Sequence, residues 1–191
     1  RLPWLRVLRM GRNSGQSAAF DAGFKAAHGQ IIATIDADLQ NDPEEIPRLV
    51  RMLEEKGVDM ITGWRKDRND SGFRRFQSRI ANRIRNWLSD ETVQDSASSL
   101  KVYRRQCLDG IKLYTGMHRF MPTLVKMRGF TCLETPVKHS PRFAGKAKYG
   151  LRNRALRAFV DLLAVRWMKK RYLRYTVSEV RPTAASTGAA A

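Results

Sequence analysis

The first 63 residues alternate short apolar segments with segments that favour helix, and this alternation limits the fold more than any other feature of the sequence. Residues 4–10 and 58–62 are short and apolar, as strands are. Residues 31–35 (IIATI) are apolar without alternation, which is typical of a central strand buried on both faces. Helices are expected between these strands, over residues 16–28 and 42–56. The order β-α-β-α-β predicts an α/β fold with a largely parallel sheet.

Both expected helices carry signals for where they begin and end. The segment Asn13–Gly15 offers a turn and a cap before the first helix. Asp42 is expected to cap the second helix, with Pro43 in the first turn and Glu45 placed to complete a capping box. Gly57 is expected to end that helix.

The rest of the chain predicts further strands and two basic helices. Strands are expected over residues 100–103 and 131–137, with a helical piece over 120–126 between them. The two basic amphipathic helices are expected over residues 73–88 and 151–173.

The net charge of +18, with a pI near 10.8, requires a polyanionic partner or surface. Nucleic acid, anionic lipid and a phosphorylated substrate all remain open on composition alone. Cys107 and Cys132 are isolated, so neither a zinc finger nor a disulfide scaffold is expected. The longest mostly apolar stretch, residues 158–165, contains Asp161. A spanning helix needs about 20 apolar residues, so no transmembrane helix is predicted.

Two carboxylates follow the expected strand at residues 31–35. Asp36 and Asp38 are separated by one residue, so both side chains point to the same side of an extended chain. Ligands of open α/β sheets bind at the carboxyl ends of the strands. Two hard oxygen donors there suit Mg²⁺ or Mn²⁺, which take their other ligands from water and substrate phosphates. The alternative is a solvated acidic turn that caps the next helix.

The acidic segment is one of a series of motifs in a fixed order along the chain. The series comprises NSGQSAA at 13–19, AG at 22–23, AAHG at 26–29, DADLQNDPEEIP at 36–47, GWR at 63–65, RR at 74–75 with Ser78 and Asn82, Asp95 with SLK at 99–101 and YRR at 103–105, GMHRF at 116–120, PRFAG at 141–145 and KYG at 148–150. Over roughly residues 7–175 it resembles the polyprenyl- and dolichyl-phosphate sugar transferases of glycosyltransferase family 2, including the dolichyl-phosphate mannosyltransferases.

This resemblance implies a GT-A fold, the Rossmann-like α/β fold of nucleotide-sugar transferases. It also implies an inverting, metal-dependent hexosyltransferase that moves a sugar from a nucleotide to undecaprenyl or dolichyl phosphate, for cell-envelope glycan or lipid glycosylation. Complete relatives begin with two further strands that bind the nucleotide, so we expect this chain to lack the first two strands of the fold. We therefore expect a partial catalytic domain over residues 1–150, an amphipathic membrane-surface helix over 151–175 and a disordered tail over 176–191.

By the resemblance, Asp36 and Asp38 would hold the metal at the donor diphosphate, with Asp38 as a catalytic residue. Gln40 would contact the donor beside them, and Arg142 and Lys148 would contact it from a later loop. The cation would neutralise charge that develops on the leaving nucleotide. A lipid phosphate is already an anion at pH 7, so positioning and charge neutralisation are expected to dominate catalysis.

An arginine-rich stretch is expected to bind the acceptor. Eight Lys or Arg against two acids lie between residues 65 and 85, a pattern that is usually only a solvated helix face. By the resemblance, Arg65, Arg75 and Ser78 would bind the acceptor phosphate, because arginine can grip a phosphate with two hydrogen bonds. Asp95 would be a catalytic residue that faces the acceptor, and its alternative is a loop cap. His118 is left open, since it could serve only to tie down its own loop.

Residues 141–175 hold eleven Lys or Arg against one acid. One face of the helix expected there repeats apolar side chains at helical spacing: Leu156, Phe159, Val160, Leu163 and Trp167. These features fit a helix that lies on an anionic membrane surface, and the alternative is an ordinary helix packed on the core. We therefore expect a peripheral protein on the cytoplasmic face of a membrane, in bacteria the inner membrane.

Other functions stay open at the level of sequence. No nucleic-acid partner is expected, because no standard nucleic-acid motif accompanies the charge. Nucleotidyl transfer would need a glycine-rich phosphate loop, of which GRNSG at residues 11–15 is a weak version. A truncated family member without activity, or a fragment that binds membranes or other polyanions, is the alternative to an active transferase. Homo-oligomerisation is left open.

Overall fold

A four-stranded mixed sheet in the order β1-β3-β2-β4 forms the centre of the computed structural model. The structure describes residues 3–65, 98–140 and 151–177, and at residues 65 and 151–156 it describes only the backbone. The strands are β1 (Ile31–Thr34), β2 (Met60–Arg65), β3 (Lys101–Arg104) and β4 (Cys132–Val137). The helices are α1 (Gln16–Ala26), α2 (Glu45–Glu55), α4 (Met121–Met127) and α5 (Leu151–Arg171), with 3-10 turns η1 (Arg105–Cys107) and η2 (Met117–Phe120).

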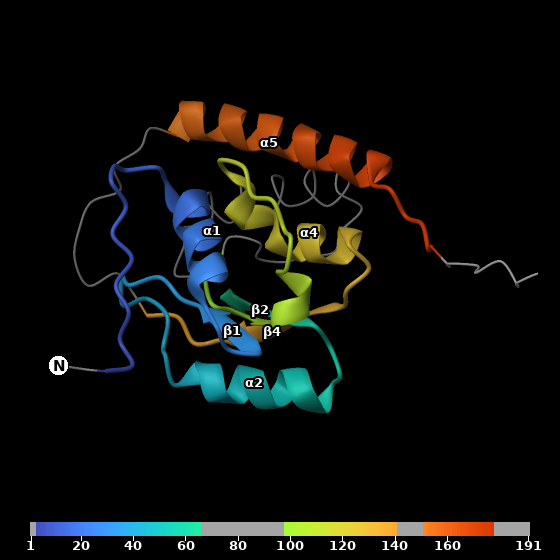
Figure 1. Ribbon diagram of the computed structural model, residues 1–191. Coiled ribbons are helices and arrows are strands. Elements are labelled where there is room, and N and C mark those ends of the chain that lie inside the picture. Colours follow the sequence, from blue (N-terminus) through green and yellow to red (C-terminus); the bar gives the residue numbers. More distant parts are fainter. Residues whose placement is uncertain (1–2, 66–97, 141–150, 178–191) are drawn as a thin grey trace, which may run out of the picture.

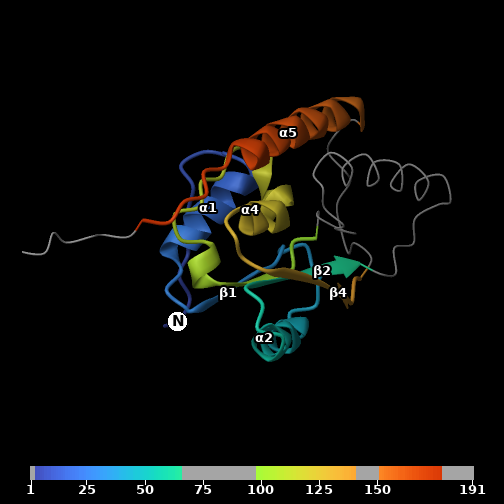
Figure 2. The same ribbon diagram turned by 90° about the vertical axis from the view of Figure 1, so that its right-hand side faces the viewer.

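The helices form layers on the two faces of the sheet (Figures 1 and 2). Helix α2 covers one face alone. Helices α1 and α4 cover the other face, and α5 lies across them as an outer layer. This arrangement confirms the α/β class that the alternating pattern predicts.

The prediction of a largely parallel sheet is wrong, because β3 lies between β1 and β2 and is antiparallel to both. Only β2 and β4 pair in parallel, from Met60 opposite Cys132 to Arg65 opposite Val137. The early strands keep their expected order along the chain, but a strand from residues 101–104 separates them. Since local patterns identify strands and not their neighbours, sequence reasoning had no signal for this insertion.

Residues 4–10 do not form the expected strand. They pair with no strand in the described part of the chain, and Trp4 and Val7 are 74% and 80% exposed. The Arg6 side chain instead donates to the carbonyl of Ala26 at the end of α1, at 2.6 Å. Strand β1 is likewise an edge strand of the described sheet rather than a central one, and Ala33 is exposed. An apolar segment becomes a strand only where a neighbour supplies hydrogen bonds, which explains why residues 4–10 are not one. Since they are not, β1 has β3 as its only strand neighbour among the described residues.

Both early helices are confirmed, but the cap predicted for α2 is wrong in detail. One turn precedes the helix, so Glu44 rather than Asp42 is its N-cap residue. The Asp42 carboxylate accepts the N–H of Glu44 at 3.0 Å, and Glu45 accepts from the Arg48 guanidinium at 2.7 Å instead of reaching backwards. Gly57 ends the helix as predicted, with a φ of 60° that favours glycine.

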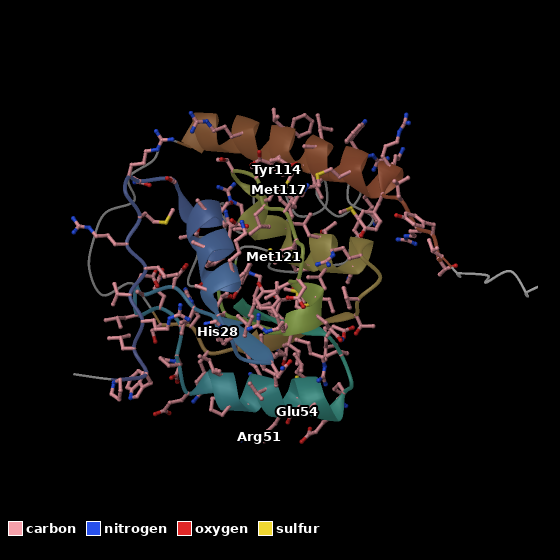
Figure 3. The ribbon with its side chains drawn as sticks, in the orientation of Figure 1. His28, Arg51, Glu54, Tyr114, Met117 and Met121 are labelled. Carbon is pink, nitrogen blue, oxygen red and sulfur yellow. The ribbon has the colours of Figure 1, made fainter. Side chains whose placement is uncertain are left out.

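Apolar side chains fill both faces of the sheet, because successive strand residues point to opposite faces. Towards α2 the core comprises Leu49, Leu53, Ile61, Leu100, Val102 and Val137. Towards α1, α4 and α5 it comprises Phe24, Ile32, Met60, Tyr103, Met121, Leu124, Val125, Leu162 and Val165, among others. Figure 3 shows Met117 and Met121 between α5 and the sheet, whereas Arg51 and Glu54 lie on the outer side of α2.

Both cysteine thiols are free. Cys107 lies in the larger core cluster, and burial raises the pKa of its thiol to about 12. The thiol is therefore neutral at physiological pH and serves as a small apolar side chain.

Helix α5 packs on the core through Leu162 and Val165, which are buried. The face predicted from the apolar repeat points elsewhere, since Phe159, Leu163 and Trp167 are exposed. The helix thus packs on the core, as the alternative in the sequence had it, but through Leu162 and Val165 and not through the predicted face. Among the helices of the described residues, none is both long and apolar enough to span a bilayer.

Gly63 in β2 provides a test of this packing. A methyl group at Gly63 would lie 2.8 Å from both γ-carbons of Val137 and 3.2 Å from the carbonyl oxygen of Leu100. We expect Gly63→Ala to lower the free energy of unfolding by about 1–3 kcal/mol, the usual cost of overpacking. Gly23 is the control, because it lies within α1 with open space around it. Gly23→Ala should raise stability by up to about 1 kcal/mol. Urea unfolding followed by circular dichroism measures both, and equal stabilities would contradict the packing described.

Candidate active site

The segment that follows β1, from Asp36 to Asn41, carries the carboxylates singled out by the sequence; we call it the acidic segment. Asp36 and Asp38 are both half-buried. Asp38 accepts the backbone N–H of Gln40 at 3.2 Å, which bends the chain into a tight turn. Leu39 completes the turn with a φ of 61°, and its side chain is 70% exposed. The turn therefore holds both carboxylates at the end of β1 without apolar packing at its tip.

Ser99 connects the two ends of the acidic segment. Its hydroxyl oxygen accepts the N–H of Asp36 at 3.2 Å and the side-chain amide of Asn41 at 2.9 Å. Its carbonyl oxygen accepts the hydroxyl of Thr34 at 2.8 Å. Ser99 can make these bonds because it lies two residues before β3, which pairs with β1.

The chain after β4 closes over the same segment. The N–H of Ser140 donates to the carbonyl of Gln40 at 2.8 Å, and the Gln40 side chain lies 3.5 Å from the Ser140 carbonyl oxygen. Asn41 and His139 form an isolated antiparallel bridge beside them. The acidic segment is thus held between the residues before β3, through Ser99, and the residues after β4, through Ser140.

The start of α1 contacts the acidic segment from a third side. The Gln16 amide donates to the Asp36 carboxylate at 2.9 Å. Next to it, the buried Ser17 hydroxyl lies 2.8 Å from Nδ1 of His118 and accepts the backbone N–H of His118 at 3.3 Å. The His118 ring also meets the edge of Phe20 at a centroid separation of 6.2 Å. His118 therefore holds the first turn of α1, from which Gln16 reaches Asp36.

The structure brings together three of the residues predicted for the donor and the metal: Asp36, Asp38 and Gln40. Arg65 ends β2, and its backbone lies at the same edge of the sheet as Asp36, because β1 and β2 are both antiparallel to β3. The Arg65 side chain lies outside the described residues, as do Arg75, Ser78, Asp95, Arg142, Lys148, the helix expected over 73–88 and the tail from residue 178.

The carboxylates of Asp36 and Asp38 fit a hard divalent cation that keeps several water ligands. In the described ranges no group of three or more His, Cys, Asp and Glu side chains gathers as a metal cluster. A cation here would therefore take carboxylate oxygens from Asp36 and Asp38 and complete its shell from water and phosphate oxygens. Mg²⁺ and Mn²⁺ sites at nucleotide phosphates are built in this way.

Sequence reasoning missed the residues that hold this site in place, namely Gln16, Ser17, Asn41 and Ser99. Each is an ordinary polar residue within a longer motif, and none carries a local sign of its partner. Ser99 could have been found only from the antiparallel pairing of β3 with β1, which places it opposite the end of that strand.

Comparison with known proteins places these features in context. Residues 2–112 match the family described as Glycosyl transferase family 2. A dodecaprenyl-phosphate galacturonate synthase from Rhizobium johnstonii is 41% identical over 164 residues, which cover 84% of this chain and 48% of that protein. An undecaprenyl-phosphate 4-deoxy-4-formamido-L-arabinose transferase from Edwardsiella ictaluri is 39% identical over 142 residues, which cover 74% of this chain and 43% of that protein. The chain thus spans about half the length of these relatives.

Solved structures share the fold. A glucosyl-3-phosphoglycerate synthase from Mycobacterium tuberculosis, in complex with Mn²⁺, uridine-diphosphate-glucose and phosphoglyceric acid, superposes with a TM-score of 0.57 at 17% identity. The match covers 87% of this chain and 58% of that one. The likeness identifies a GT-A-like α/β fold with a mixed sheet.

The contact between α1 and His118 can be tested by removing one hydroxyl. We expect Ser17→Ala to lower the free energy of unfolding by about 1–3 kcal/mol, because the substitution removes a buried hydroxyl and both of its bonds to the half-buried His118. Ser14→Ala is the control, since the Ser14 hydroxyl is exposed and donates to the carbonyl of Arg12 within its own turn, at 3.3 Å. Chemical unfolding of both variants checks the difference, and a Ser17→Ala protein as stable as Ser14→Ala would rule out the supporting role.

Proposed function

The chain belongs to glycosyltransferase family 2, and we propose that it forms the metal-binding and acceptor-facing part of an inverting enzyme that moves a sugar from a nucleotide to a polyprenyl phosphate. The relatives described above support this acceptor, since their names specify dodecaprenyl and undecaprenyl phosphate. The observation that carries the proposal is the pair Asp36 and Asp38, held at a strand end by Gln16 and Ser99.

Asp36 and Asp38 would hold Mg²⁺ or Mn²⁺ at the donor diphosphate. When bound, the cation would supply electrostatic stabilisation of the negative charge that develops on the departing nucleotide. Gln16 fixes the orientation of the Asp36 carboxylate through its hydrogen bond, and the turn at Gln40 fixes that of Asp38. Gln40 bonds the Asp38 carboxylate through its backbone N–H and would contact the donor.

The acceptor needs little activation, because a lipid phosphate is already an anionic nucleophile at neutral pH. The chain's task is then to hold the phosphate oxygen in line with the anomeric carbon of the sugar. Arg65, Arg75 and Ser78 are the proposed phosphate ligands, with Asp95 facing the acceptor. The position of the Arg65 backbone, at the same sheet edge as Asp36, supports this assignment for Arg65. Arg142 and Lys148 are the proposed donor contacts from the loop after Ser140.

We place this enzyme on an anionic membrane surface through α5. Four apolar side chains on this helix face solvent: Phe159 is 45% exposed, Val160 56%, Leu163 43% and Trp167 66%. They are spaced by one, three and four residues, so they lie along one side of the helix. We call them the α5 stripe. Leu162 and Val165 already bury the opposite side of the helix in the core. The α5 stripe therefore does not pack on the core, and we propose that it inserts into a membrane surface.

Charge and aromatic content favour a bilayer as the partner of the α5 stripe. Arg157, Lys170, Arg171 and Arg174 are exposed on and just after the helix. Tyr172 and Tyr175 follow at 40% and 78% exposure. Aromatic side chains prefer the interface between headgroups and acyl chains, and each nearby cation adds about 1 kcal/mol of attraction to an anionic leaflet. We propose peripheral attachment to the cytoplasmic face of a membrane, in bacteria the inner membrane.

The proposed chemistry predicts a steep dependence on the acidic pair. Asp36→Asn and Asp38→Asn should each lower sugar transfer at least about 100-fold, because the charge that neutralises the leaving nucleotide is no longer held. The assay uses purified protein, Mn²⁺, undecaprenyl phosphate and a panel of nucleotide sugars, with the lipid product identified by mass spectrometry.

Asp42→Asn serves as the control, since Asp42 caps the turn before α2 and should tolerate an amide. Unchanged transfer by Asp38→Asn would remove the proposed role of the pair. If the wild-type protein transfers no sugar from any donor in the panel, an inactive family member becomes the better interpretation.

The membrane proposal predicts that acidic residues in the α5 stripe abolish attachment. Wild-type protein should float with vesicles of phosphatidylglycerol and phosphatidylcholine, and its tryptophan fluorescence should shift to the blue on binding. Leu163→Glu should weaken vesicle binding at least about tenfold, since a buried carboxylate is costly in an apolar phase. Val7→Glu is the matched control, because Val7 is also apolar and exposed but belongs to the N-terminal segment. Equal binding by the two variants would refute the α5 stripe as the attachment surface.

A further inference from the structure

A single buried hydroxyl holds both ends of the acidic segment. The Ser99 side-chain oxygen lies 3.2 Å from the backbone nitrogen of Asp36 and 2.9 Å from the side-chain nitrogen of Asn41. Ser99 is 5% exposed and Asn41 is 8% exposed, so water does not compete freely for these bonds. The six residues from Asp36 to Asn41 therefore form a loop that is closed at its base by one oxygen atom.

Within the loop, the Asp38 carboxylate accepts the N–H of Gln40 and bends the tip into a turn. Its tip includes Leu39, a non-glycine residue in the left-handed region at a φ of 61°, with its side chain largely in solvent. Residues held in this region normally depend on the surrounding structure to maintain them. The bonds from Ser99 at the base of the loop, together with those from Ser140 and Gln16, hold this turn from outside.

The bonds of the Ser99 hydroxyl can be removed without removing the bonds that Ser99 makes through its backbone. The bond from the Thr34 hydroxyl goes to the Ser99 carbonyl, which every side chain at this position retains. The pairing of β1 with β3 begins at Thr34 opposite Lys101, and it also uses backbone atoms alone. Removal of the hydroxyl therefore releases the loop at its base and leaves the β1–β3 ladder in place.

We propose that Ser99 is a positioning residue: by holding the two ends of the loop, it sets where the Asp36 and Asp38 carboxylates lie relative to each other, while Gln16 and the turn at Gln40 fix the orientation of each carboxylate. The Ser99 hydroxyl acts through the backbone of Asp36 and the side chain of Asn41, both of which it bonds. The inference rests on the proposed function of the two carboxylates at a divalent cation. It explains why a buried serine stands two residues before β3, where an apolar residue would otherwise suit the core.

The neighbouring residue provides a matched control. Ser98 is 2% exposed, and its hydroxyl has no hydrogen-bond partner among the described residues. Ser98→Ala and Ser99→Ala thus remove the same atom from adjacent buried positions, and only the second breaks contacts with the acidic segment. Ser99→Thr keeps the oxygen and tests rescue.

The first measurement is Mn²⁺ binding to the purified protein, followed by electron paramagnetic resonance of the free ion. We expect Ser99→Ala to raise the Mn²⁺ dissociation constant at least about tenfold, because a loosened pair of carboxylates must be reordered when the cation binds. Ser98→Ala should bind as the wild type does, and Ser99→Thr should recover most of the affinity. In the transfer assay, excess Mn²⁺ should restore part of the lost rate of Ser99→Ala.

The second measurement is amide hydrogen exchange over residues 36–41, which needs neither metal nor activity. We expect faster exchange there in Ser99→Ala than in Ser98→Ala, with unchanged exchange in β3. Wild-type exchange and wild-type Mn²⁺ affinity in Ser99→Ala would overturn the proposal. If wild-type protein binds no Mn²⁺ and transfers no sugar, the proposed function fails, and exchange alone then decides whether Ser99 positions the segment. If Ser99→Ala does not fold, as judged by circular dichroism, Asn41→Ala replaces it, since that change removes one of the same two bonds.

Discussion

The insertion of β3 between β1 and β2 is the constraint on which the rest of the structure depends. It pairs residues 101–104 with strands that lie 70 and 41 positions earlier in the chain, so that Lys101 stands opposite both Thr34 and Thr62. Because β1 and β2 are each antiparallel to β3, they run in the same direction and end at the same edge of the sheet. That edge receives Asp36 from one strand and Arg65 from the other. A sheet without β3 would place neither the acidic pair nor Ser99 where they are.

The acidic pair is held from three directions, and each direction comes from a different part of the chain. Ser99 holds the base of the loop, Gln16 holds one carboxylate from the start of α1, and Ser140 holds the backbone from the end of β4. Such support matters because preorganised charge stabilises a transition state only when it need not move during the reaction. Ser99, Gln16 and Ser140 therefore contribute to the site by holding the two carboxylates in place.

The sequence predicted what is local and failed on what is not. Helices α1 and α2, strands β1 and β2 and the positions of Asp36 and Asp38 follow from periodicity, Gly57 and a strand-end pattern within a few residues. The strand expected at residues 4–10 has the right composition, yet Val7 and its neighbours find no partner strand in the described structure. The capping box at Glu45 fails because one extra turn precedes the helix and Arg48 supplies a better partner. Ser99 was invisible because its role depends on the antiparallel pairing, which no local pattern encodes.

Helix α5 shows the same limit for a single element. Its apolar residues fall on two sides, and periodicity identified Phe159, Leu163 and Trp167 without revealing that Leu162 and Val165 are the ones that reach the core. The helix also touches the site's supports, because a side chain at Gly116 would overlap the carboxylate of Asp161, and Gly116 immediately precedes the turn that carries His118. His118 in turn holds Ser17 at the start of α1, next to the Gln16 side chain that bonds Asp36. The short turn η2 and its N-cap Gly116 therefore connect two distant features of the molecule. On one side lies α5, with its exposed apolar stripe, and on the other lies the start of α1, which holds the Asp36 carboxylate.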